Sequence, residues 1–412
     1  MTTRQSIESQ AATAGTLPLQ FRWPQPGMNS PHPRRADFGR RVTSAHEDTG
    51  FALGWDYAHY RSTPPAALAQ KPSALRNGLL AGQAVFGLRT LVASRHVRTW
   101  LQLRLHAWQR GRSVEVVQVT PNYLQQIDVS HCPITRERLG TAPAEPLSEA
   151  SVDRVRNDAG YAAGNLAVMS RRANLAKAAH GFHGAMEKVN PPESLETMAP
   201  VEMTPAPPTT PATDSAELPS TTPATPATPA GASLNRAEWA RVATLCSFVE
   251  PLTHAQACAL PMLLLPPNRL RLFNPVQALQ AFVSLQLLKP GWARRVRCFT
   301  ELLPGAALQR DFRSFFLSLL PRVLEAGKLS GQLETRWAIE DAWLTLRVQQ
   351  RWNRFALQLD AAQCEALLAR AAAQHLATAL IQPLTQVGAT DGWNLANAGY
   401  LAGYLNASDS SV

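Results

Sequence analysis

The chain has 412 residues, more than one ordinary domain contains, and its 45% hydrophobic content excludes a wholly disordered protein. Its formal net charge is +10. The excess lies entirely before residue 191, where 23 Lys and Arg accompany 13 Asp and Glu, whereas the remainder holds 17 of each kind. A charge imbalance confined to one half is typical of a protein that meets a polyanion, of which nucleic acid is the commonest and an anionic membrane surface the rival.

Five cysteines are spread through the chain without a CxxC pair. This spacing favours neither a zinc ribbon nor a disulfide scaffold, and it is typical of thiols that stay reduced in a cytosol. The first thirty residues lack the apolar core of a signal peptide, and prolines interrupt the richest apolar run, at 258–267. We therefore expect a soluble, cytoplasmic protein without a membrane partner.

Changes in composition divide the chain into four parts. Residues 1–50 mix arginines with prolines and small polar residues, which predicts a disordered basic arm. Residues 189–232 are rich in Pro and Thr and end in TTPATPATPAGA, which predicts a flexible linker. Between arm and linker, 51–188 is expected to be a basic domain that binds nucleic acid. After the linker, 233–407 is dominated by Leu and Ala, with weak strand signals, which predicts a mostly all-α domain.

In chain order, the first clear element is a helix at 94–109, with Arg95 and Arg98 on one face and apolar residues broadly opposite. Valines at 114–119 then predict a short extended segment. A Thr-Pro pair at 120–121 is typical of an N-cap and a first helical position, so we expect a short helix to begin there.

The segment 151–177 carries the residues best suited to chemistry. Its pattern predicts two short strands, at 151–155 and 166–169, joined by a turn and followed by a helix. If the strands fold back on this helix, Asp153 and Asn174 come together. Carboxylate and amide oxygens suit a hard divalent cation such as Mg²⁺ or Mn²⁺, so the pair predicts a metal site.

Asp153 and Asn174 belong to a longer set of residues that follow one another in a fixed order along the sequence. The set is Cys132, Thr135, 151–155, Gly160, Tyr161, Gly164, Asn165, Ala173, Asn174 and Lys177. In order and spacing it resembles the HNH or ββα-metal nucleases, in particular a phage and bacterial branch with the pattern C-x-x-T, S-[LV]-D-R-[IV], G-Y, G-N and a-N-x-x-K. The resemblance covers about 118–180. It implies an α+β N-terminal domain with a ββα-metal motif, followed by a separate, mostly all-α C-terminal domain.

The resemblance implies metal-assisted hydrolysis of DNA phosphodiester bonds. Asp153 and Asn174 match the metal ligands, which would hold Mg²⁺ or Mn²⁺, and Asn165 matches the loop residue that holds the hairpin and orients the catalytic group. The family's water-activating histidine follows the aspartate, but this position is Arg154. A guanidinium stays protonated at ordinary pH, so Arg154 cannot act as that base.

Three alternatives follow from the missing histidine. In the first, His131, His180 or His183 supplies the base from another element, and His131 is counted among the predicted catalytic residues. In the second, the metal alone activates water. In the third, hydrolysis is lost and the fold is kept for binding DNA.

Basic side chains in and near the predicted hairpin, and on the polar face of the 94–109 helix, are expected to contact DNA phosphates. Such contacts make binding strongly dependent on salt and weakly dependent on sequence. The predicted contact residues are Arg95, Arg98, Arg154, Arg156, Arg171, Arg172 and Lys177.

The C-terminal half contains one further pattern, a stripe of Trp with interleaved Arg at helical spacing over 334–359. Such a stripe is typical of a core or of a surface for a partner. Three functions therefore stay open: a metal-dependent DNA endonuclease, a non-catalytic DNA-binding or regulatory protein with a degenerate site, and an assembly protein. The third would bind a protein partner, or itself, through 233–407.

Overall fold

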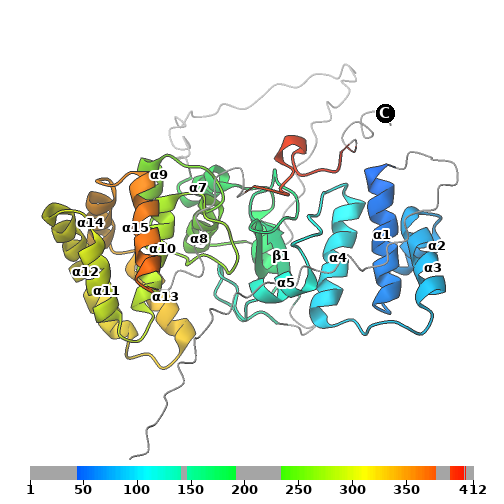
Figure 1. Cartoon of the computed structure of the whole chain (residues 1–412), viewed down its shortest axis with the longest axis horizontal. Helices are drawn as coiled ribbons and strands as arrows, with labels where there is room; N and C mark the ends of the chain where they lie inside the picture. Colours follow the sequence, from blue (N-terminus) through cyan, green and yellow to red (C-terminus); the bar gives the residue numbers. More distant parts are fainter. Residues whose placement is uncertain (1–43, 141–145, 192–232, 377–389, 403, 405–412) are drawn as a thin grey trace, which may run out of the picture. The chain divides into compact units, whose positions relative to one another are not determined.

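The structure, a computed structural model, describes residues 44–140, 146–191, 233–376, 390–402 and 404 (Figure 1). Most of the arm predicted at 1–50, and all but the first residues of the linker predicted at 189–232, lie outside these residues.

Five helices open the described chain. They are α1 (Ala45–His59), α2 (Ala66–Gln70), α3 (Ala74–Phe86), α4 (Arg95–Gln109) and α5 (Pro121–Ile127). The helices predicted after Ser94 and Thr120 are confirmed as α4 and α5, and each hydroxyl accepts a hydrogen bond from a backbone N–H in the first turn. α1 and α3 approach so closely that a Cβ at Gly54 would lie 1.9 Å from the Leu75 carbonyl oxygen, which only glycine avoids.

A small sheet follows these helices. β1 (Ala150–Arg154) and β2 (Leu166–Ser170) pair antiparallel, with Asp153 opposite Ala167. α6 (Arg171–Lys177) begins directly after β2, and α7 (Phe182–Val189) follows it. The strands predicted at 151–155 and 166–169 are thus present, each within one residue of its predicted bounds.

Both faces of β2 are buried. Leu166 and Val168 belong to a core formed with α1, α3, α4 and α5, whereas Ala167 and Met169 belong to a core formed with later helices. This alternation reflects the two-residue period of a strand, and it explains why β2 is apolar throughout. Because Asp153 is directly opposite Ala167, it lies on the face that looks toward the later helices.

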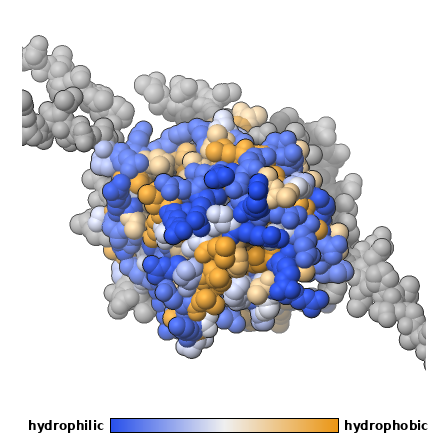
Figure 2. Space-filling model, turned by 90° about the vertical axis from the view of Figure 1, so that its left-hand side faces the viewer, coloured by the Kyte–Doolittle hydropathy of each residue, from blue (hydrophilic) through white to orange (hydrophobic). Residues whose placement is uncertain are grey.

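The remaining described chain is helical. Its elements are α8 (Arg236–Ser247), α9 (His254–Ala259), α10 (Pro275–Leu287), α11 (Trp292–Leu302), α12 (Ala306–Ala326), α13 (Gln332–Ala342), α14 (Leu346–Ala356), α15 (Ala361–Ala373) and a 3₁₀ turn, η1 (Leu395–Asn397). No helix among the described residues combines the length and the apolar character that a membrane crossing needs. Figure 2 turns the side on which Figure 1 draws α12 and α14 toward the viewer, and strongly hydrophilic side chains lie there beside an apolar strip.

The stripe at 334–359 is two helices, not one. The helical conformation is interrupted at 343–345, between α13 and α14. The break turns the Trp343 indole into the core, where Nε1 donates to Ser284 Oγ at 3.1 Å and the ring meets Trp352 edge-on at 5.3 Å. Trp343 and Trp352 are fully buried, so they form core and offer no surface to a partner.

One hydrophobic core joins segments on both sides of 192–232. Cys132, Val155 and Met169 pack in the same cluster as buried residues of α8, α10, α12, α14 and α15. The described residues, all of which follow Thr43, accordingly belong to one compact unit.

The predicted α+β N-terminal domain with a ββα-metal motif is wrong. In the part of the chain that the structure describes, fifteen α-helices accompany a single sheet of two five-residue strands, and the architecture is mostly helical. Of the valines at 114–119, Val114 forms an isolated bridge with Tyr161, but no strand continues from it, because the Glu115 carboxylate accepts hydrogen bonds from the backbone N–H groups of Val117 and Gln118 and holds a turn. The two strands lie between α5 and α6 in a chain that is otherwise mostly helical over the described residues.

Candidate functional site

Asp153, the predicted metal ligand, is bound to a lysine. Lys177 ends α6, is completely buried, and places its Nζ 3.0 Å from Asp153 Oδ2. The same ammonium donates to the Arg154 carbonyl oxygen at 3.0 Å. Burial raises the pKa of the Asp153 carboxyl, while the positive charge of Lys177 opposes that rise. The Asp153 carboxyl group therefore already has an internal cation beside it.

The second predicted ligand is also engaged. Asn174 Nδ2 donates to Ser151 Oγ at 2.7 Å, a contact that ties α6 to β1. Among the described residues, no three His, Cys, Asp or Glu side chains gather where they could hold a metal ion. A divalent cation at Asp153 would have to displace or face the Lys177 ammonium, so these residues do not fit Mg²⁺ or Mn²⁺.

Asn165, predicted to hold the hairpin, is fully buried in the connection between β1 and β2. Its Oδ1 accepts from the Arg156 backbone N–H at 2.8 Å, and its Nδ2 donates to the carbonyl oxygens of Arg156 and Gly160 at 3.0 and 3.2 Å. All of these partners are backbone groups of the connection, so the side chain fixes its shape.

The two arginines of the hairpin are turned inward on the same connection. Arg154 Nη1 donates to the carbonyl oxygens of Asn157 and Ala159, at 3.0 and 2.8 Å, and its guanidinium lies 5.2 Å from the centre of the Tyr161 ring. Arg156 forms a bidentate pair with Asp158, at 2.7 Å for each bond. Each guanidinium therefore already has polar partners within the connection.

The three histidines considered as bases contact aromatic rings. His131 meets Trp337 of α13 edge-on at 5.7 Å, with Nδ1 3.0 Å from Ser130 Oγ. His180 meets Trp239 of α8 edge-on at 5.5 Å, and burial lowers the pKa of its imidazole. His183 is exposed at the start of α7 and packs beside Phe182. Among the described residues, no ion pair or hydrogen bond joins any of these imidazoles to Asp153, whose ion-pair partner is Lys177.

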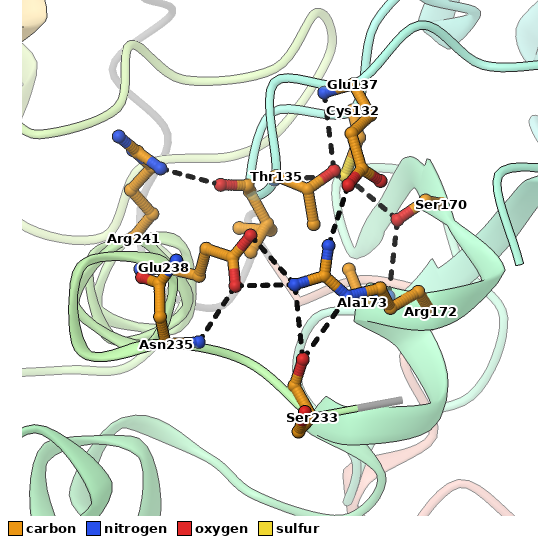
Figure 3. Close-up of polar contacts among 11 residues, drawn as sticks. Cys132, Thr135, Glu137, Ser170, Arg172, Ala173, Ser233, Asn235, Glu238 and Arg241 are labelled. Carbon is orange, nitrogen blue, oxygen red and sulfur yellow. Dashed lines mark hydrogen bonds and ion pairs between the residues drawn. The ribbon is translucent and has the colours of Figure 1, made fainter. Parts of the chain in front are cut away.

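Arg172, predicted to bind phosphate, joins three elements (Figure 3). Its guanidinium donates to Glu137 Oε1 at 2.7 Å, to Glu238 Oε2 at 2.8 Å and to the Ser233 carbonyl oxygen at 3.1 Å. Glu238 is 5% exposed and also closes the capping box at the start of α8. Arg172 therefore docks α6 and the 131–139 loop on α8.

The other predicted phosphate contacts lie at the surface. Arg171 is half exposed, with Glu149 at 3.9 Å. Arg95 pairs with Asp128 at 3.4 Å, and Arg98 Nη1 donates to the Ala93 carbonyl oxygen at 2.8 Å. These three side chains keep donors directed to solvent, unlike Lys177 and Arg172.

The carboxylates that pair with the predicted cations were not predicted from the sequence. Glu238 is signalled in the sequence by its place three residues after Asn235, the spacing of a capping box, but that pattern does not show that it also binds Arg172. Cys132 is buried, and its Sγ accepts from the Thr135 backbone N–H and the Ser170 hydroxyl, both at 3.4 Å. The matched residues thus form one interlocked structural unit.

Comparison of the chain with protein-family models, with curated proteins and with solved structures finds no match. The resemblance to HNH nucleases therefore depends on the motif residues alone.

Proposed function

We propose that the protein binds DNA without cleaving it, and that the nuclease-like residues serve as structural supports. The observation that carries the proposal is the buried ion pair between Lys177 and Asp153. An internal ammonium 3.0 Å from the carboxylate supplies the positive charge that a metal would bring to a nuclease site. Arg154 stands where the family has its base, so neither half of the hydrolytic machinery is available.

The surface charge of the N-terminal half supports DNA as the partner. Cations neutralise phosphates and release the counterions condensed on DNA, which is the main source of affinity that does not depend on sequence. Eight basic residues between 44 and 191 are exposed. Among the described residues, seven of them have no carboxylate within 4 Å, and Arg171 has one at 3.9 Å. The eight are Arg61, Lys71, Arg89, Arg98, Arg110, Arg138, Arg171 and Lys188.

The test measures binding and cleavage with the same full-length protein. Fluorescence anisotropy with a labelled DNA duplex, between about 50 and 200 mM salt, is expected to give an affinity that falls linearly in a log–log plot. Supercoiled plasmid incubated with Mg²⁺, Mn²⁺ or EDTA is expected to stay supercoiled. Metal-dependent nicking that Asp153→Asn abolishes would show a nuclease instead, and the absence of DNA binding at low salt would refute the proposal.

A further inference from the structure

A second basic feature lies on the C-terminal helices, where α12 and α14 pack side by side (Figure 1). Their contact is aromatic. Phe315 of α12 meets Trp352 of α14 at 5.1 Å between ring centres, and Phe312 meets Phe355 at 5.2 Å. This packing fixes the two helices as one rigid pair and directs the polar residues of both to a shared outer edge.

A groove of about 490 Å³ follows this outer edge. Its polar lining consists of Arg310, Arg313, Ser314 and Ser318 from α12 and Arg347 and Arg351 from α14. Within α12 the lining extends over twelve residues, from Arg310 to Pro321, or about 16 Å at the helical rise. The positions recur at helical spacing, so they form one continuous stripe on the helix.

The groove carries four positive charges, and its lining contains no carboxylate. Arg310, Arg313 and Arg347 are exposed, and within the described chain no acidic side chain lies within 4 Å of them. Arg351 Nη1 donates to the Ser314 carbonyl oxygen at 2.8 Å, which holds this guanidinium at the junction of the two helices. Guanidinium groups do not lose their protons, so their mutual repulsion persists at any ordinary pH.

A row of unpaired guanidiniums is matched by a ligand with a row of negative charges. Arginine forks bind phosphate oxygens in pairs of parallel hydrogen bonds, and serine hydroxyls add donors beside them. Phosphates on one strand of a duplex follow one another at about 3.4 Å along the axis, so a groove of about 16 Å spans several of them. The length, the charge and the donor types agree with a polymer of phosphodiesters.

We propose that the α12–α14 groove binds consecutive phosphates of a nucleic acid backbone, an inference that rests on the proposed DNA-binding function and locates a site for it. The groove is basic although its half of the chain has a formal charge of zero, because the acidic residues of that half lie outside its lining; Asp311 of α12, for example, pairs with Arg354 of α14. Two exposed leucines lie on the same helices, Leu317 in the groove lining on α12 and Leu346 at the start of α14, and a sugar or base can pack against them.

The experiment compares two double variants of the full-length protein. Arg313→Gln with Arg347→Gln neutralises one groove residue on each helix and spares Arg351, which ties the helices together. Arg294→Gln with Arg297→Gln is the matched control, because both side chains are exposed on α11, lie outside the groove and remove the same charge. Equal thermal unfolding midpoints for the three proteins show that the changes leave the fold intact.

Binding is measured by anisotropy with labelled single-stranded DNA and, separately, with a duplex, across the same salt series. The groove variant is expected to bind about tenfold more weakly at low salt. Its salt slope is expected to be smaller by about 0.7 per lost contact on a single strand or about 0.9 on a duplex. The DNA for which the groove variant loses more affinity, single-stranded or duplex, is the form that occupies the groove. The α11 variant is expected to bind both DNAs as the wild type does.

The outcomes separate the two proposals. If the wild type binds DNA and the groove variant matches it in affinity and slope, the groove inference is wrong and the proposed function stands. If the wild type fails to bind either DNA, both are wrong. Binding of vesicles that contain phosphatidylserine, lost in the groove variant while DNA binding is kept, would assign the groove to a membrane surface and overturn the inference.

Discussion

Lys177 Nζ lies 3.0 Å from Asp153 Oδ2, and both side chains are removed from solvent. A buried ion pair becomes very unfavourable when one partner is lost, because the remaining charge has no solvent and no counterion. We expect Asp153→Ala to lower the free energy of unfolding by about 3–5 kcal/mol. Urea denaturation followed by circular dichroism measures this change.

The double variant Asp153→Leu with Lys177→Met provides the control, since it replaces both charges with apolar groups of similar size. Its unfolding free energy is expected to lie within about 1 kcal/mol of the wild type, because such replacements of buried pairs are often neutral or stabilising. A double variant as unstable as Asp153→Ala would show that the pair is not the source of the loss.

The same pair predicts how the protein responds to metal. A ligand present at 100 times its dissociation constant adds about 2.7 kcal/mol to the stability of the folded state. Because Lys177 occupies the charge-compensating position at Asp153, we expect millimolar Mg²⁺ or Mn²⁺ to leave the thermal unfolding midpoint unchanged. A rise that EDTA reverses and Asp153→Asn abolishes would contradict the geometry described above.

Cysteine reactivity tests the hydrophobic core that is shared by the residues before 192 and after 232. Burial raises the pKa values of Cys246, Cys258 and Cys364 to about 12, so their thiolates are scarce at neutral pH. Cys132 is buried as well, whereas Cys298 is partly exposed. Under native conditions a thiol reagent is expected to modify Cys298 first and the other four only after denaturation. Mass mapping identifies the site, and Cys298→Ser should remove the fast phase; fast modification of Cys246 would mean that α8 is not packed as described.

Local elements were predictable from the sequence because local interactions determine them. Ser94 and Thr120 are followed by helical spacing, and their hydroxyls bind the first-turn N–H groups. The strands around Asp153 were predictable from short apolar runs. The mostly helical architecture of the N-terminal half was not, because the nuclease motif implies an α+β domain, whereas helices surround the two-stranded sheet in the described residues.

The ion-pair partners of Lys177 and Arg172 were not predictable, because they depend on contacts between segments distant in the sequence. Lys177 and Arg172 read as surface cations on a short helix, but packing buries Lys177 beside Asp153 and sets Arg172 against Glu238. The groove between α12 and α14 has the same origin. Arg313 and Arg347 meet across it only because Phe315 packs on Trp352.

His46 gives the protein a measurable response to acid. Its imidazole is stacked on the Trp108 indole, with 5.1 Å between ring centres and 11° between planes. Burial lowers the pKa of His46, and the nearby Glu47 carboxylate only partly opposes this. The unfolded chain therefore binds a proton more readily than the folded chain between the folded pKa and about 6.5. This contribution to stability is present above that window and is lost as the pH falls through it.

We expect His46→Phe, which keeps the stacked ring and removes the titrating group, to lose less unfolding free energy than the wild type between about pH 7 and pH 5. Urea denaturation at each pH provides the comparison. His183→Asn, at an exposed position, controls for the removal of an imidazole from the surface and is expected to follow the wild type. If His46→Phe loses stability as steeply as the wild type, the acid response arises elsewhere, and the protonation of His46 does not compete with its stacking on Trp108.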